Sequence, residues 1–358
     1  MQNSPPSAAP LPALWDRFPS LAGAAFMPTV DRRACAVGPA ARLRGGSIGH
    51  DATSMRILLT GASGSIGAAL APALIRQGHD VRGFGREPAR VTAGIPVIRG
   101  DAVTGVGLDE ALDGIDVAYF LIHSMEGSDR AGFEARERAS AENFVVAAQR
   151  AGVRRVVYLG GIVPRRRTLS RHLGSRLEVE RVLLAGLPEA VALRASIVIG
   201  ASSRSFRFMV HLVERMKLLA LPAWRENRTQ PIDVRDVRAF LLAAATTPQA
   251  AGGLSLDIAG PDVLTYGRMI ERIADLMLVQ RRTLRFGRNV TPIVAPVAAR
   301  VAGEDPGFIG PLMESLEGDL LPRDEHAAQL LGVRLHSFDR AVERALREWE
   351  AAEPLSAR

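Results

Sequence analysis

The sequence predicts an α/β fold, a doubly wound parallel Rossmann sheet followed by a smaller C-terminal α+β substrate or lid region. Short apolar runs alternate six times with helix-compatible segments between residues 55 and 200, which is typical of parallel strands covered by helices. A glycine-rich turn at 61–67 follows the first apolar run. After residue 200 the alternation stops, so we expect the smaller region at 201–358.

The first strand, the turn and the helix after it form the segment around which the chain is organised. Residues 57–59 are a short apolar run, and glycines follow at positions 61, 64 and 67. Glycine allows a sharp turn and a close approach of a ligand to the backbone. The next helix offers free N–H groups and a positive dipole end to a pyrophosphate. This strand–turn–helix pattern predicts a dinucleotide site, with an ordinary glycine-rich turn as the alternative.

The end of the second expected strand, 80–84, indicates which dinucleotide binds. In a dinucleotide fold this position meets the adenosine ribose, where an acidic residue favours NAD and an arginine accommodates the 2′-phosphate of NADP. Arg86 therefore predicts NADP as the cofactor, with NAD as the second choice because Glu87 follows. Glu87 and Pro88 also resemble a helix start, and a solvated loop arginine is the alternative role for Arg86.

The remaining elements follow the same alternation. Further strands are expected at 95–99, 117–122, 154–159 and 190–193, with helices at 108–112, 129–151 and 174–186. In the second region we expect helices at 206–219, 233–246, 265–278 and 336–350 and a strand at 254–258, and 290–335 has no clear pattern. Thr265 is a candidate N-cap. Ligands in such a sheet bind at the carboxyl ends of the strands.

Composition narrows the class of protein. Hydrophobic residues make up 47% of the chain, yet no run of eighteen apolar residues occurs, so no transmembrane segment is predicted. The single cysteine, Cys35, excludes an internal disulfide framework and permits a reducing compartment, so we expect a cytoplasmic protein. The net charge is +7, but the arginines are scattered and aromatic residues are 5%. We therefore predict no nucleic-acid partner and no metal site.

Residues 1–54 are expected to lie outside the fold as a disordered extension. Prolines, among them those at positions 5, 6, 10, 12, 19 and 28, interrupt any helix, and no secretory signal pattern occurs. A hypothesis for this segment is that translation begins at Met55. The expected domains are then 55–200, which binds the dinucleotide, and 201–358, which supplies the substrate pocket. The many Leu, Val and Met residues of the second part favour an apolar substrate.

Three segments carry a resemblance to a known family. Residues 60–67, the turn at Gly100 and Asp101, and residues 230–237 resemble the extended and atypical short-chain dehydrogenase/reductases. The chain is most similar to the atypical NAD(P)H-binding branch, which includes NmrA-like proteins and the nucleotide-binding accessory subunit of respiratory complex I. Residues 122–125 are also similar to a subgroup of bacterial NAD(P)H-binding proteins. The resemblance runs from about residue 55 to about residue 280 and is strongest over 55–125.

The resemblance implies a cofactor site, residue by residue. Arg86 would read the adenosine ribose, and Asp101 and Ala102 would lie beside the adenine. Leu121 and His123 would lie beside the ribose on the nicotinamide side, although His123 could equally be a structural residue. The pyrophosphate would be lined by Gly61, Ser63, Gly64, Ser65 and Ile66, next to Gly67 of the same motif. Many relatives pair through the helices after the fourth and fifth strands, which leaves a homodimer open.

The family's catalytic Tyr-x-x-x-Lys pair and serine do not carry over. Four residues beyond the tyrosines at 119, 158 and 266 stand His, Ile and Ile, and Lys217 is the sole lysine. His172 occupies the expected tyrosine position and Arg176 the lysine position, whereas Gly160 and Gly161 replace the serine.

Two interpretations of this substitution remain open. In the first, His172 is a general acid whose imidazole titrates near neutral pH, and Arg176 holds the ribose without moving protons. The protein is then an oxidoreductase acting on a small organic substrate. In the second, His172 is a polar surface residue and the protein binds NADP(H) as a sensor, scaffold or assembly factor. An epimerase would also need the missing tyrosine. Arginines 165–167 could recruit an anionic substrate or simply form a solvated charge run.

Overall fold

The computed structural model describes residues 54–123, 132–164, 169–285, 298–301, 303, 309–310, 313 and 315–353. All of these belong to one unit, Asp51–Arg358. The extension expected at 1–54 lies outside the described residues except for Ser54, and the loop arginines 165–167 lie outside them as well. The expected start at Met55 therefore stays a prediction.

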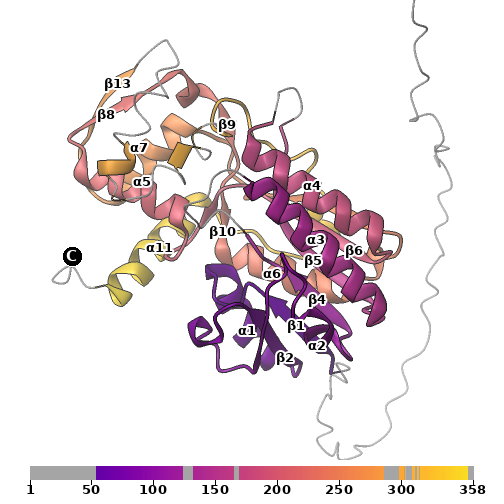
Figure 1. Ribbon diagram of the computed structural model, residues 1–358. Helices are drawn as coiled ribbons and strands as arrows, with labels where there is room; N and C mark the ends of the chain where they lie inside the picture. The colour runs from indigo at the N-terminus through magenta and orange to yellow at the C-terminus, as the bar shows by residue number, and fades with distance from the viewer. Residues whose placement is uncertain are drawn as a thin grey trace, which may run out of the picture. The chain divides into compact units, whose positions relative to one another are not determined.

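A seven-stranded parallel sheet lies at the centre of the unit, in the order β11-β6-β5-β4-β1-β2-β3 (Figure 1). The order reverses between β1 and β4, where Leu59 pairs with Gly83 on one side and Tyr119 on the other. In such a sheet ligands bind at the carboxyl ends of the strands beside this reversal. The fold class predicted from the sequence is confirmed. The strands are β1 Arg56–Thr60, β2 Asp80–Gly85, β3 Val97–Arg99, β4 Val117–Phe120, β5 Arg155–Gly161, β6 Ala190–Ala195 and β11 Leu254–Ile258.

Helices cover both faces of this sheet because its strands are apolar on both sides. In β1, Ile57 and Leu59 belong to one core cluster and Leu58 to another. The first cluster includes residues of α1 and α6, and the second includes residues of α2, α3 and α4. Figure 1 shows α3 and α4 side by side on one face. The helices are α1 Ser65–Arg76, α2 Leu108–Leu112, α3 Phe133–Arg150, α4 Arg171–Gly186 and α6 Val234–Thr246.

The sheet extends further along the chain than the six-fold alternation indicated. Strand β11 pairs with β6 in parallel, from Leu254 opposite Val191 to Ile258 opposite Ala195. Both β11 and α6 were expected in the smaller region. In the structure β11 is a strand of the central sheet, and α6 packs on one face of that sheet. A short alternating segment such as 254–258 predicts a strand but carries no local signal for its partner.

The rest of the second half packs around its own core cluster, which includes Phe206, Trp224, Tyr266 and Trp349. Figure 1 shows α5, α7, β8 and β13 gathered together, with α11 beside them. These elements are α5 Arg204–Arg215, β8 Leu218–Leu221, α7 Tyr266–Leu276, β13 Arg282–Arg285 and α11 Phe338–Ala352. The short elements are β7 Val198–Ile199, β9 Arg228–Thr229, β10 Ile232–Asp233, β12 Leu264–Thr265, α10 Ala327–Leu330 and the 3₁₀ turns η1 Pro88–Arg90, η2 Ala223–Glu226 and η3 Pro248–Ala250.

One element of this half differs from the expected helix at 206–219. Helix α5 ends at Arg215, the next residue is extended, and β8 pairs with β13 in parallel. The guanidinium of Arg281 donates hydrogen bonds to the carbonyl oxygens of Val213 (2.5 Å) and Glu214 (3.0 Å). This side chain satisfies carbonyls that a helix end leaves without partners, so a residue distant in sequence ends the helix.

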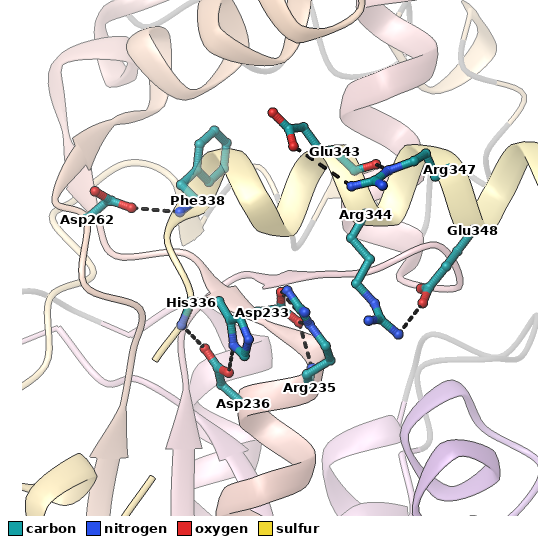
Figure 2. A network of polar contacts seen from close by, with 10 residues as sticks. All are labelled: Asp233, Arg235, Asp236, Asp262, His336, Phe338, Glu343, Arg344, Arg347 and Glu348. Carbon is teal, nitrogen blue, oxygen red and sulfur yellow. Dashed lines mark hydrogen bonds and ion pairs between the residues drawn. The ribbon is translucent and has the colours of Figure 1, made fainter. Parts of the chain in front are cut away.

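The motif at 230–237 attaches the C-terminal segment to the sheet (Figure 2). Asp233 caps α6 by accepting a hydrogen bond from a backbone N–H two residues on (2.7 Å). Asp236, 1% exposed, accepts hydrogen bonds from the backbone N–H (2.8 Å) and Nδ1 (2.5 Å) of His336. Asp262 accepts one from the backbone N–H of Phe338 at the start of α11 (2.6 Å). These carboxylates hold α11 and the segment before it in place.

Candidate dinucleotide and substrate site

The turn between β1 and α1 is shaped by two glycines that no other residue could replace without movement. Gly61 has φ 69°, and a Cβ there would lie 2.5 Å from the carbonyl oxygen of Leu121. A Cβ at Gly67 would lie 2.3 Å from the carbonyl oxygen of Gly61. The backbone N–H of Gly64 donates to that same oxygen at 3.0 Å. The carbonyl oxygen of Gly61 is thus enclosed by the turn itself, and the absence of side chains at the glycines lets a ligand approach the backbone.

The first turn of α1 has neither a side-chain cap nor an acidic residue, as a pyrophosphate site requires. Gly64 is the N-cap and supplies no side-chain hydrogen bond, and the first turn contains no acidic residue. Ser63, Gly64 and Ser65 are exposed, whereas Ile66 is half-buried. Because helix N-termini carry unsatisfied N–H groups and a positive dipole end, an anion is stabilised there. The residues expected to line the pyrophosphate of a dinucleotide thus fit that group.

A buried threonine fixes the crevice between β1 and β4. The hydroxyl of Thr60 donates to the carbonyl oxygen of Tyr119 (2.9 Å) and accepts from the backbone N–H of Leu121 (3.0 Å). Thr60 is fully buried, so this link is shielded from water. It positions the end of β4, which carries Leu121 and His123, against the glycine turn. The sequence analysis did not single out Thr60, although it directly precedes Gly61.

The residues expected beside the adenine lie in a turn stabilised by their own side chains. The carboxylate of Asp101 accepts a hydrogen bond from the backbone N–H of Val103 (2.9 Å). The side-chain amide of Asn143 on α3 donates to the carbonyl oxygens of Ala102 (3.1 Å) and Val103 (2.9 Å). Ala102 is buried. Asn143 is therefore a residue that sequence reasoning missed, because nothing in the helix pattern marks it.

Arg86 lies at the end of β2, where the adenosine ribose is expected. Its side chain is exposed, and within the described residues it forms no ion pair or hydrogen bond. The neighbouring Glu87 lies within 3.9 Å of Arg90. The guanidinium of Arg86 is thus available to an anionic ligand.

The residues expected on the nicotinamide side come together around one buried cation. Arg176 on α4 is 9% exposed, and its Nη1 contacts the ring of His123, 3.0 Å from Nε2. Its backbone carbonyl accepts a hydrogen bond from the hydroxyl of Tyr158 on β5 (3.1 Å). His172 lies one turn earlier on α4, and its Nδ1 is buried with no partner among the described residues. Two of the predicted residues are therefore in contact, and the third is their neighbour.

The protonation state of His172 follows from this environment. Burial, and after it the charge of Arg176, lowers the pKa of His172 to about 3. The ring is therefore neutral at pH 7, not the imidazole titrating near neutral pH that the sequence suggested. Burial also raises the pKa of Tyr158 to about 12. Gly160 and Gly161 stand at the expected serine position, and a Cβ at Gly161 would lie 3.2 Å from the side chain of Leu173.

A buried carboxylate supports the residue next to Arg176. Glu137 on α3 is 3% exposed and accepts a hydrogen bond from the hydroxyl of Ser175. The charges of Arg176 and Glu137 both act on Tyr158. Sequence reasoning missed Glu137, because α3 contains other glutamates that look the same in the sequence but face solvent.

A cavity of about 190 Å³ opens within the second half, among α5, β8, η2 and α7. Ile197 and Leu316 are among its lining residues. The hydroxyl of Ser170, which caps α4 two residues before His172, lies 3.0 Å from the hydroxyl of Ser315. Ser315 directly precedes the lining residue Leu316, so this contact links the segment that carries Leu316 to the start of the helix that carries His172 and Arg176.

The fold and the site together define a dinucleotide-binding Rossmann protein. Residues 61–187 match the model of a family described as NAD(P)H-binding. This part of the chain is an NAD(P)H-binding domain, and the resemblance to the atypical short-chain dehydrogenase/reductases is confirmed. NADP and NAD are not distinguished by this match.

Relatives and structures of known proteins agree with that class. The chain is similar to an Arabidopsis thaliana protein named NADH dehydrogenase [ubiquinone] 1 alpha subcomplex subunit 9, 27% identical over 43% of this chain and 38% of that one. It is also similar to a 3-beta-hydroxysteroid dehydrogenase of Mycolicibacterium neoaurum, 35% identical over 29% of this chain and 31% of that one. The matches thus span only about a third of the length of these relatives.

Among solved structures, the fold is similar to a short-chain dehydrogenase/reductase superfamily protein of Agrobacterium tumefaciens with bound NAD. The TM-score is 0.62 at 21% identity, over 85% of this chain and 100% of the other. In the described part of the chain, no helix has the length and apolar character needed to cross a membrane.

Proposed function

We propose that this protein is an oxidoreductase that uses NADP(H) to reduce or oxidise a small organic substrate. The observation that carries the proposal is the buried cation Arg176, held against His123 at the carboxyl end of β4 and beside the glycine turn. A buried positive charge at this edge suits the ribose of a nicotinamide and an oxygen that gains negative charge. The steroid dehydrogenase among the relatives supports a redox function.

The chain's own residues would serve this chemistry by charge and position. A bound nicotinamide would supply the hydride that adds to a carbonyl carbon, whose oxygen then takes up one proton. Arg176 stabilises the negative charge on that oxygen but keeps its own proton. His172 is neutral at pH 7, so it donates a hydrogen bond from its ring N–H and has no extra proton to give. The proton therefore comes from water.

The preference for NADP over NAD rests on Arg86. Its guanidinium is exposed and forms no pair within the described residues, while Glu87 lies near Arg90. A 2′-phosphate would gain a charge-assisted hydrogen bond from Arg86. A 2′-hydroxyl would gain much less from it.

A second candidate function is non-catalytic binding of NADP(H), as a sensor, scaffold or assembly factor. It is favoured by the neutral His172, by the absence of a Tyr-x-x-x-Lys pair and by the glycine at the serine position. The Arabidopsis relative, named as a subunit of an NADH dehydrogenase, is compatible with such a role. A homodimer and a cytoplasmic location stay predictions under either function.

The experiment that tests cofactor choice is a calorimetric titration with NADPH and with NADH. Arg86→Ala should weaken NADPH binding about tenfold, or about 1.4 kcal/mol. This loss is near the low end for a hydrogen bond to a charged group, because the exposed side chain of Arg86 is screened by water. NADH binding should change less than about twofold. The control is Arg76→Ala, an exposed arginine in the last turn of α1. Equal losses for both dinucleotides would contradict the role of Arg86.

Oxidation of NADPH with a panel of carbonyl compounds separates the two functions. For an oxidoreductase we expect substrate-dependent turnover that Arg176→Met lowers at saturating NADPH, because the fixed charge acts on the substrate oxygen. Tight NADPH binding without turnover on any carbonyl compound would support the non-catalytic function. If neither dinucleotide binds, both functions are excluded.

A further inference from the structure

We infer that the cavity of the second half binds the hydrocarbon part of a compact, uncharged carbonyl or alcohol substrate. This inference rests on the proposed oxidoreductase function and names its substrate class. The cavity measures about 190 Å³, and an apolar protein cavity of about 150 Å³ holds benzene. By this scale it takes a ring or branched chain of roughly eight carbon atoms. Larger or strongly polar molecules would have to lie mainly outside it.

The lining of the cavity rejects charge. Its side chains are aliphatic, thioether or aromatic except for the hydroxyl of Ser205 and the polar atoms of Trp224 and Tyr266. Trp224 Nε1 is buried with no hydrogen-bond partner in the described part of the chain. No charged side chain lines the cavity among the described residues. A phosphate or a polyhydroxylated group would therefore lose its hydration there and gain only a few polar partners in return.

Methionines give the cavity an adaptable shape. Four of the nine methionines in the chain line it, at positions 209, 216, 269 and 313. Methionine is unbranched and polarisable, so it fits around apolar ligands of different outlines. Met209 and Met269 are buried on α5 and α7, which face one another in the same core cluster. These residues suit a hydrocarbon ligand better than a hydrogen-bonded one.

The position of the cavity relates it to the buried cation. Ile197 in its lining follows β6, and the backbone N–H of Ile162, just beyond β5, donates to the carbonyl of Ala195 (3.1 Å). The contact between Ser170 and Ser315 joins the start of α4 to the segment that contributes Leu316 to the lining. The cavity thus lies at the carboxyl edge where substrates bind in this fold. The inference requires that the oxygen of a substrate held in this cavity reaches Arg176.

The test measures apolar binding and dinucleotide binding on the same samples. Indole, an uncharged bicyclic compound with eight carbon atoms and one nitrogen, serves as the probe in calorimetric titrations, and cyclooctanone and dihydroxyacetone serve as competitors. Cyclooctanone should displace the probe, and dihydroxyacetone should not. Ala220→Phe, which fills the cavity from β8, should weaken probe binding at least tenfold. Ser205→Leu fills it from α5 and replaces the first variant if Ala220→Phe fails to fold. The control is Ala351→Phe, an exposed position in the last turn of α11.

The outcomes separate this inference from the proposed function. NADPH should bind wild type, Ala220→Phe and Ala351→Phe equally, and cyclooctanone-dependent NADPH oxidation should show a raised KM in Ala220→Phe alone. Two outcomes overturn the inference while NADPH still binds: the probe does not bind at all, or both filling variants leave probe binding unchanged. Either outcome leaves the proposed oxidoreductase function intact. Turnover of dihydroxyacetone in preference to cyclooctanone also overturns it. Probe binding without any dinucleotide binding overturns the proposed function and, with it, the assignment of the ligand as a substrate.

Discussion

Replacing Gly67 by alanine should lower both stability and cofactor affinity. A glycine in a helix interior normally costs stability, so alanine there gains about 0.5–1 kcal/mol. At Gly67 the sign is reversed, because the new Cβ would lie 2.3 Å from the carbonyl oxygen of Gly61 and 2.9 Å from Cα of Ala62. Both neighbours are backbone atoms, so neither can turn away.

The size of the effect follows from what must move. Relief of the clash requires α1 to shift away from the turn, and overpacking of this kind costs about 1–3 kcal/mol. Since the helix propensity gained is less than about 1 kcal/mol, the free energy of unfolding should fall by about 1–2 kcal/mol. The shift also moves the N–H groups of the first turn away from the pyrophosphate. We therefore expect at least a tenfold loss of NADPH affinity, or about 1.4 kcal/mol.

Urea unfolding and calorimetric titration with NADPH measure the two effects. The matched control is Gly174→Ala in α4, where a Cβ would meet no atom within 4 Å. This variant should be more stable than wild type by about 0.5–1 kcal/mol. A Gly67→Ala protein that is as stable as wild type and binds NADPH equally well would refute the close approach of α1 to the turn.

Two further predictions concern pH. Because the pKa of folded His172 lies near 3, below the usual 6.5, its neutral ring contributes stability that is lost as pH falls from 6.5 toward 3. The NMR signal of this ring, identified by its absence in His172→Ala, should not shift between about pH 5 and 8, and an inflection near 6.5 would contradict the burial. Burial raises the pKa of Asp236 above 3.8 in spite of its hydrogen bonds from His336. The stability of wild type relative to Asp236→Asn should therefore fall as pH rises above 3.8. Urea titrations at several pH values measure this difference in the free energy of unfolding. A rise with pH would show that the ion pair between Asp236 and His336 outweighs the effect of burial.

The parts of the fold that could be predicted from the sequence are those with local causes. The turn after β1 requires glycine for steric reasons, and strand, turn and helix lie within about twenty residues. Strand β11 has the predicted bounds because its alternating apolar and polar residues are flanked by glycines. Thr265 was predicted as an N-cap, and its hydroxyl accepts a hydrogen bond from the backbone N–H of Arg268 (3.1 Å). In each case the signal that predicts the element lies in neighbouring residues.

The parts that could not be predicted depend on residues far apart in the chain. The partner of β11 is β6, about sixty residues earlier. Helix α5 ends where it does because Arg281 reaches its last carbonyls. The apolar run after Lys217 suits a helix or a strand equally well, and pairing with β13 decides between them. Glu137 has no mark in the sequence, since its burial arises only when α3 packs on α4.

Under the proposed oxidoreductase function, substitution at the tyrosine and lysine positions need not abolish the chemistry. A lysine and a tyrosine together supply a charge and a proton, whereas the pair found here supplies a charge alone. The positive charge of Arg176 helps to keep His172 neutral, after the larger effect of burial. The result is a fixed positive charge beside a neutral hydrogen-bond donor and an apolar cavity. Such a site favours a developing oxyanion over a neutral carbonyl, and it leaves proton delivery to water at the carboxyl edge of the sheet.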